Sequence, residues 1–267
     1  MTRVDLALVE RGLAPSRSRA QELVTGGRVF VGLGESRRVV SKASVQVAND
    51  EHLEVISAGE NEDFVSRGGL KMRGALDHLQ LKVSGYHVLD VGISTGGFAD
   101  CLLLAGADRV VGVDVGHGQL AATLRVDPRV RLLEGVNARE LSNQHHLARI
   151  FELNQGQNFD LIVIDVSFIS LTLVLPEVIQ YLRGSSALLA LVKPQFEVGR
   201  AGLGKNGIVK DSTLYPSVEE KIRQSCSANN LIMGDYFASS IEGTDGNREF
   251  FLFARPETRP ETGTDSV

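Results

Sequence analysis

The stretch LDVGISTGGFADCLLLAGADRVVGVDVG, residues 89–116, contains the pattern that decides the fold. An apolar run ends at a glycine cluster, an apolar stretch with helical spacing follows, and a second apolar run closes on Asp114. This order is typical of a strand, a tight turn, a helix and a parallel strand that bind a nucleoside-containing cofactor at the edge of a sheet. A nicotinamide dinucleotide and S-adenosylmethionine both bind in such a unit, and they imply different chemistry.

Strand-like and helix-like segments alternate from residue 86 onward. Near-continuous apolar runs occur at 87–92, 109–115, 129–135, 159–168 and 187–196. Such runs belong to parallel strands that are buried on both faces of a sheet. Helices fit at 170–182 and 217–230, whereas the apolar segments 231–243 and 248–256 follow each other without a helix between them. We therefore predict a doubly wound α/β fold, with a mostly parallel seven-stranded sheet that ends in an antiparallel hairpin.

The glycine spacing and this sheet favour S-adenosylmethionine as the cofactor. A dinucleotide site uses G-x-G-x-x-G to bring a helix N-terminus to the pyrophosphate, whereas the glycines here follow G-x-x-x-G-G. S-adenosylmethionine has no phosphate, and an acid beside the turn suits its cationic groups. Asp114 would bind the ribose hydroxyls, and Asn137 either contacts the adenine or caps its own loop. The predicted cofactor-binding residues are Asp90, Gly92, Ser94, Gly96, Gly97, Asp114 and Asn137.

Residues 1–59 have a different character and are basic. Up to residue 48 they hold eight Arg and Lys against four Asp and Glu, although the whole chain carries a net charge of −5. Two short helices are expected, the second capped by Ser16, and short strands follow at 28–32 and 45–57. The charge indicates either a solvated surface or contacts with RNA phosphates.

The segment RVDLALVERGLAPSRSRAQELVTGGRVFVG (3–32), with Ser41–Lys42 and HLEVI (52–56), resembles the S-four-type RNA-binding domain. That resemblance spans roughly 55 residues and favours the RNA interpretation. The predicted RNA-binding residues are Arg11, Arg17, Arg19, Arg28, Arg37 and Lys42.

Four charged residues are expected near the strand ends: Lys71, Asp165, Lys193 and Glu249. The segment DVSFIS (165–170) lacks the motif of base-amine methyltransferases, and neither cysteine is placed to attack a pyrimidine carbon. A ribose 2′-hydroxyl is a weak acid that needs a positioned group for its proton. Two lysines with two carboxylates would form a charge-balanced cluster for this purpose. We therefore predict these four residues as catalytic.

These residues resemble the Lys-Asp-Lys-Glu tetrad of FtsJ-like ribose methyltransferases. With SRGGLK (66–71), DVGISTGGF (90–98), VDVGHGQL (113–120), DVSFISL (165–171) and LVKPQFEVG (191–199), the chain is similar to the TlyA (hemolysin A) family over residues 1 to about 256. The resemblance implies 2′-O-methylation of cytidine in ribosomal RNA. It also implies that Lys193 is the base or the proton-steering group, with the other three residues supporting it.

The remaining features of the sequence set only broad limits on the location and partners of the protein. Only two cysteines occur, Cys101 and Cys226, which suggests a reducing compartment, and no apolar run is long enough for a signal peptide or a membrane span. We expect a cytoplasmic monomer or weak homodimer that acts on ribosomal RNA or ribosomal subunits, without a metal or a membrane. The predicted divisions are the RNA-binding domain (1–59), a linker (60–66), the methyltransferase domain (67–256) and a disordered tail (257–267).

Three alternative functions remain open at this point. The chain could be a non-catalytic RNA-binding factor of ribosome assembly, a membrane-lytic hemolysin or a dehydrogenase. Phe196, the last residue of the fifth strand-like run, either stacks on a base or packs in the core.

Overall fold

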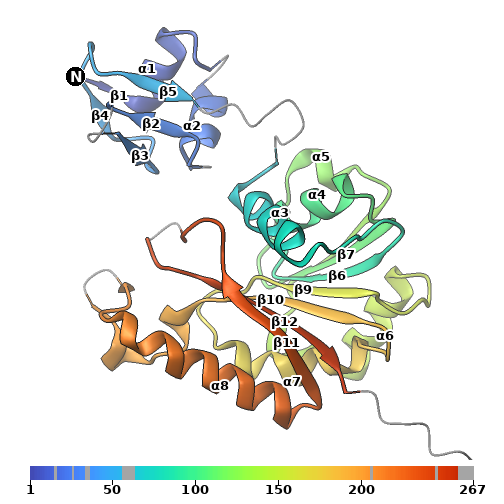
Figure 1. The fold of residues 1–267 in the computed structure, drawn as a ribbon. Helices are drawn as coiled ribbons and strands as arrows, with labels where there is room; N and C mark the ends of the chain where they lie inside the picture. Colours follow the sequence, from blue (N-terminus) through green and yellow to red (C-terminus); the bar gives the residue numbers. More distant parts are fainter. Residues whose placement is uncertain are drawn as a thin grey trace, which may run out of the picture. The chain divides into compact units, whose positions relative to one another are not determined.

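The computed structural model describes residues 1–14, 17–25, 27–33, 37–55, 64–204, 207–243 and 246–257. Within these ranges the chain divides into two compact units, residues 1–67 and 68–267 (Figure 1). Ser16, residues 60–63 of the predicted linker and residues 258–267 of the predicted tail lie outside the described residues.

The N-terminal unit packs a helix pair against two small antiparallel sheets. The first sheet pairs β1 with β4, and in the second β2 lies between β3 and β5. The apolar residues Val4, Leu8, Val24 and Val29 are fully buried in one core. The predicted strand at 45–57 is two strands, because a turn closed by the Glu51 amide and the Ala48 carbonyl divides it. The elements are β1 (Thr2–Arg3), α1 (Val4–Glu10), α2 (Arg17–Thr25), β2 (Val29–Val31), β3 (Arg38–Val40), β4 (Gln46–Val47) and β5 (Leu53–Val55).

The second unit is built on a seven-stranded sheet with the order β11-β12-β10-β9-β6-β7-β8. The five strands from β10 to β8 are parallel, and β12 runs antiparallel to both β10 and β11. This arrangement confirms the predicted fold class. The strands are β6 (His87–Val91), β7 (Arg109–Asp114), β8 (Val130–Glu134), β9 (Leu161–Ile164), β10 (Ala187–Val192), β11 (Leu231–Ala238) and β12 (Phe250–Pro256).

Helices cover this sheet, and their apolar positions explain how. Val218, Ile222 and Cys226 recur every four residues along α8 and are buried in the same core as Ile150 of α6 and Val178 of α7. Apolar side chains of α3 and α4 are buried as well, and Phe98 of α4 stacks on Phe251 of β12. The helices are α3 (Arg67–Leu79), α4 (Gly97–Leu104), α5 (Ala122–Arg125), α6 (Gln144–Leu153), α7 (Leu175–Val178) and α8 (Tyr215–Ala228).

The helix predicted at 170–182 is shorter and less regular than expected. Only α7 is α-helical, and 3₁₀ turns flank it at Leu171–Leu173 and Ile179–Tyr181. Pro176 lacks the backbone N–H that a continuous helix would require at that position. No helix in the described ranges is both long enough and apolar enough to cross a bilayer.

Candidate active site

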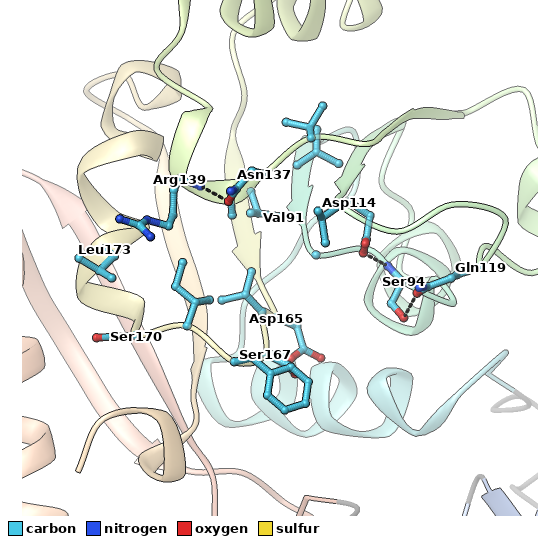
Figure 2. Close-up of a pocket in the computed structure, with 18 residues that line it drawn as sticks. Val91, Ser94, Asp114, Gln119, Asn137, Arg139, Asp165, Ser167, Ser170 and Leu173 are labelled. Atoms are coloured by element: carbon cyan, nitrogen blue, oxygen red, sulfur yellow. Dashed lines mark hydrogen bonds between the residues drawn. The ribbon is translucent and has the colours of Figure 1, made fainter. Parts of the chain in front are cut away.

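A pocket of about 680 Å³ lies at the carboxyl ends of β6, β7 and β9 and just beyond β8 (Figure 2). Open α/β sheets bind their ligands at this edge, and the volume suits a small-molecule cofactor. Four predicted cofactor residues line the pocket: Gly92, Ser94, Asp114 and Asn137. Asp165, predicted as catalytic, lines it too.

Two glycines shape the turn between β6 and α4. Gly92 has φ +86°, and a Cβ there would lie 2.4 Å from the Asp165 carbonyl oxygen. Gly96 has φ +93°, and its Cβ would lie 2.3 Å from a methyl group of Leu124. Both positions therefore require glycine for conformation and for space. Gly96 and Gly97 are buried and do not line the pocket. They therefore shape the turn and form no part of the pocket surface.

Asp114 joins the loops that follow β6 and β7. Its Oδ2 accepts the Ser94 amide at 2.8 Å, and its Oδ1 accepts the Gly116 amide at 2.7 Å. The Ser94 hydroxyl donates in turn to Oε1 of Gln119 at 3.0 Å, as Figure 2 shows. Each carboxylate oxygen can accept more than one hydrogen bond, so Asp114 retains acceptor capacity toward the pocket.

Asp90 is held very differently. Its side chain is fully buried, and neither carboxylate oxygen has a hydrogen-bond partner within the described part of the chain. Burial raises the pKa of Asp90 well above its usual range, and the carboxylates of Asp165 and Asp114 raise it further. Asp90 does not line the pocket, so it lies behind the turn, where a neutral carboxyl is favoured.

Asn137 both lines the pocket and caps its own loop. Its Oδ1 accepts the Arg139 amide at 3.0 Å and begins a 3₁₀ turn at Ala138–Glu140. Its amide nitrogen has no role in that cap. Arg139 and Gln119 also line the pocket. Gln119 lies in the motif VDVGHGQL (113–120) but was not predicted as a site residue, and no motif or spacing distinguished Arg139.

The four predicted catalytic residues form two ion pairs. Nζ of Lys193 lies 2.6 Å from Oδ1 of Asp165, and it also donates to the Ser167 hydroxyl at 2.8 Å. Nζ of Lys71, on α3, lies 2.5 Å from Oε2 of Glu249. The Lys71 and Glu249 side chains are only 10% and 3% exposed. Each pair therefore joins one positive lysine to one negative carboxylate, and their attraction offsets the cost of removing both charges from water.

The sheet register brings the two pairs to the same edge. Val192, the last residue of β10, is paired with Phe250, the first residue of β12. Lys193 directly follows Val192, and Glu249 directly precedes Phe250. Because β10 and β12 are antiparallel, Lys193 and Glu249 therefore lie opposite each other at the ends of these strands. Asp165 comes directly after β9, which is the other neighbour of β10. The residues that were expected to gather at the strand ends thus come from three adjacent strands and α3.

An exposed aromatic residue lies beside this charged cluster and was not predicted as a site residue from the sequence. Phe168 lines the pocket, is 92% exposed and has φ +64°, a conformation that non-glycine residues rarely adopt. Its ring centroid lies 5.3 Å from that of Phe196, which is half-buried. A single aromatic residue after a strand has no periodic pattern, so the sequence carried no signal for it.

In the N-terminal unit a buried carboxylate organises part of the basic surface. Asp5 is fully buried and accepts hydrogen bonds from Arg3, Arg17 and Gln21. These bonds, with that of Arg3 the strongest, hold the pKa of the Asp5 carboxyl far below its usual range. Arg17 uses its Nε for this contact, and its side chain is 55% exposed. Its terminal nitrogens therefore remain available to a phosphate.

The other predicted RNA-binding residues are held in different ways. Arg11 donates to the carbonyls of Ala48, Asn49 and Glu51, which favours a structural role at that turn. Arg37 pairs with Glu54 and lies over the Phe30 ring. Arg28 is half-buried and Lys42 is exposed, whereas the side chain of Arg19 lies outside the described residues.

The described ranges contain no group of three or more His, Cys, Asp or Glu residues that could hold a metal ion. Cys101 and Cys226 are both buried, and neither forms a disulfide bond within these ranges.

Comparison with known proteins identifies the family. The FtsJ-like methyltransferase model matches residues 64–255, and the S4 domain model matches residues 2–33. The chain is 40% identical over 257 residues to the 16S/23S rRNA (cytidine-2′-O)-methyltransferase TlyA of Mycobacterium tuberculosis, covering 96% of this chain and 90% of that protein. The chain belongs to the TlyA group of FtsJ-like methyltransferases.

Two further relatives carry a hemolysin name. The Hemolysin A of Brachyspira hyodysenteriae is 35% identical over 252 residues, which cover 93% of this chain and 97% of that protein. The solved structure of a candidate hemolysin from Streptococcus thermophilus superimposes with a TM-score of 0.71 at 35% identity, covering 98% of this chain and 92% of that one. The family resemblance predicted from the motifs is confirmed over both units of the chain.

Proposed function

We propose that this protein transfers the methyl group of S-adenosylmethionine to the ribose 2′-hydroxyl of cytidine in ribosomal RNA. The observation that carries the proposal is the Lys193–Asp165 ion pair, placed by the sheet register beside Glu249 and at the edge of the cofactor-sized pocket. The M. tuberculosis relative, named as a cytidine-2′-O-methyltransferase of 16S and 23S rRNA, supports the choice of substrate.

The residues around the pocket fit S-adenosylmethionine. Gly92 lines the pocket, and its positive φ and close packing against the Asp165 backbone shape the turn on which the ligand would lie. We assign the ribose hydroxyls to Asp114 and the adenine edge to the free amide nitrogen of Asn137, with Ser94 beside the turn. When bound, the cofactor supplies an electrophilic methyl group on a sulfonium.

The charged cluster handles the ribose hydroxyl. Lys193 accepts or steers the 2′-hydroxyl proton, and Asp165 and Ser167 fix its amine in place. Lys71 and Glu249 form a second buried pair that balances the charge of this edge of the sheet. Phe168, exposed beside the cluster, is suited to contact a base of the RNA.

The N-terminal unit supplies RNA affinity. Arg17, Arg28, Arg37 and Lys42 are the proposed phosphate contacts with described side chains, and Arg19 is a further candidate. Arg11, the sixth residue predicted from sequence, donates to backbone carbonyls and is not assigned to phosphate. We place the protein in the cytoplasm with its ribosomal substrate, as a monomer or weak homodimer.

The experiment incubates the protein with ribosomal subunits and S-adenosylmethionine labelled in the methyl group. Digestion to nucleosides should yield labelled 2′-O-methylcytidine. Binding to subunits without any label would instead support a non-catalytic assembly factor, and label in another nucleoside would refute the assigned target. Leakage from liposomes at the same protein concentration would support the lytic alternative suggested by the hemolysin names.

A further inference from the structure

Glu197 forms a buried network beside the active site that the proposed chemistry does not use. Its side chain is only 1% exposed, although it carries a charge. Glu197 lies beyond β10, four residues after Lys193. It is the C-terminal cap residue of the 3₁₀ turn Pro194–Phe196. A buried carboxylate must find several partners to offset its desolvation.

The partners of Glu197 come from two other segments. Its Oε1 accepts the Leu171 backbone amide at 2.7 Å, and its Oε2 accepts the Ser170 hydroxyl at 2.6 Å. The same Oε2 is paired at 2.7 Å with Nζ of Lys221 on α8, and this amine also donates to the Glu197 carbonyl. One carboxylate thus fastens the segment after β9 to the segment after β10 and to a helix.

The fastened segment, residues 165–171, carries groups at the site. Asp165 and Ser167 are the two contacts of the Lys193 amine, and residues 165–170 all line the pocket. Within this segment Phe168 adopts φ +64°, an unfavourable conformation that the surroundings must maintain. The two hydrogen bonds to the Glu197 carboxylate join the end of this segment directly to the segment that follows Lys193. Lys221 adds an indirect link, because its amine contacts both the Ser170 hydroxyl and the Glu197 carbonyl.

We infer that Glu197 is a positioning residue: its carboxylate tethers residues 165–171 so that Asp165 and Ser167 meet the Lys193 amine. The inference rests on the proposed function. The tether is the contact with the Leu171 amide and the Ser170 hydroxyl. Lys221 compensates the buried charge, and its amine adds a longer contact of 3.3 Å to the Ser170 hydroxyl.

Two conservative variants separate the tether from the charge. Glu197→Gln removes the charge but keeps an oxygen for the Leu171 amide, and Lys221, 42% exposed, can turn toward water. Glu197→Asp keeps the charge but withdraws the carboxylate by about 1.5 Å, one carbon–carbon bond. Asp160→Asn is the control, since Asp160 accepts the His87 amide at 2.8 Å where β6 and β9 begin, at the opposite edge of the sheet.

The measurement is single-turnover methyl transfer to ribosomal subunits, with melting temperature and cofactor affinity determined in parallel. A tether predicts that Glu197→Asp lowers the rate by about 10-fold or more, because small displacements of reacting groups are costly. Glu197→Gln should stay within about threefold of the wild type, as should Asp160→Asn. The inference would be overturned if Glu197→Gln transfers the methyl group more slowly than Glu197→Asp. It would also be overturned if both variants lose the same rate or if neither loses any.

Failure of the proposed function would be visible separately, as a wild-type protein that methylates no ribosomal RNA. Cofactor affinity then decides the role of Glu197, because the tethered segment lines the pocket. Weaker binding in the Asp variant than in the Gln variant supports the tether, and equal binding in the two contradicts it.

Discussion

At the scale of residues, two carboxylates near the same turn are held in opposite ways. Asp114 accepts two backbone amides and borders the pocket, so these bonds hold its carboxylate where a ligand can reach it. Asp90 is buried without a hydrogen-bond partner among the described residues, and burial disfavours its ionised form. We therefore expect Asp114, and not Asp90, to contact the ligand.

Removal of the Asp114 carboxylate should weaken the cofactor selectively. We expect Asp114→Ala to lose on the order of 2 kcal/mol of cofactor binding, about 30-fold in Kd, with RNA affinity unchanged. Asp127→Ala is a matched control, because Asp127 also accepts the amide two residues ahead of it but lies before β8, away from the pocket. Calorimetry that finds equal cofactor affinity in the two variants would remove Asp114 from the site.

Asp90 should make the cofactor-free protein sensitive to pH. Because its folded-state pKa is raised, the stability of the folded state declines as pH rises above about 3.9, the pKa of an unfolded Asp, and stops declining above the folded-state pKa. Asp90→Asn lacks this penalty. Thermal melts should show the Asn variant more stable near neutral pH, with the difference shrinking toward pH 4. A difference that is constant over this range would show that Asp90 does not titrate with folding.

At the scale of elements, the tight turn after β6 should tolerate no side chain. Gly92→Ala meets both a positive φ and the Asp165 carbonyl, so we expect a loss of more than about 1 kcal/mol in the free energy of unfolding and weaker cofactor binding. Gly184→Ala is the control, since a Cβ there has no neighbour within 4 Å and its φ is not positive. Denaturant titration of both proteins gives the comparison, and equal stability would contradict the account of the turn.

The elements also show what the sequence could predict. The strands of the second unit were predictable because runs such as Ala187–Val192 are apolar throughout and are buried throughout. The gathering of Asp165, Lys193 and Glu249 followed from their places at strand ends, whereas Lys71 lies on α3. Their pairing did not, because it depends on the register of β10 with β12 and on where α3 packs. The tether at Glu197 was hidden for the same reason: its partners are 26 and 27 residues earlier in the chain.

At the scale of the whole molecule, we expect the N-terminal unit to supply RNA affinity and the second unit to carry out the chemistry. Phosphate contacts weaken with salt because binding releases counterions. Exchanging Arg17 and Lys42 together for Ala should therefore weaken RNA binding and lower the slope of log Kd against log salt by about 1 to 2, with cofactor affinity unchanged. Arg149→Ala with Arg223→Ala removes the same charge from exposed positions on α6 and α8. If this control pair has the same effect, the N-terminal unit makes no specific contribution.

The most direct test of the account is the single-turnover rate of Lys193→Ala on ribosomal subunits, read as labelled 2′-O-methylcytidine. If Lys193 acts on the proton of the ribose hydroxyl, as we propose, its loss should lower the rate by about 100-fold to 10,000-fold and leave the Kd of cofactor and of RNA nearly unchanged. Lys193→Arg keeps the charge but cannot release a proton near neutral pH, so recovery of the rate in Arg would assign Lys193 an electrostatic role. A near-normal rate in Lys193→Ala would contradict the proposed chemistry at this site.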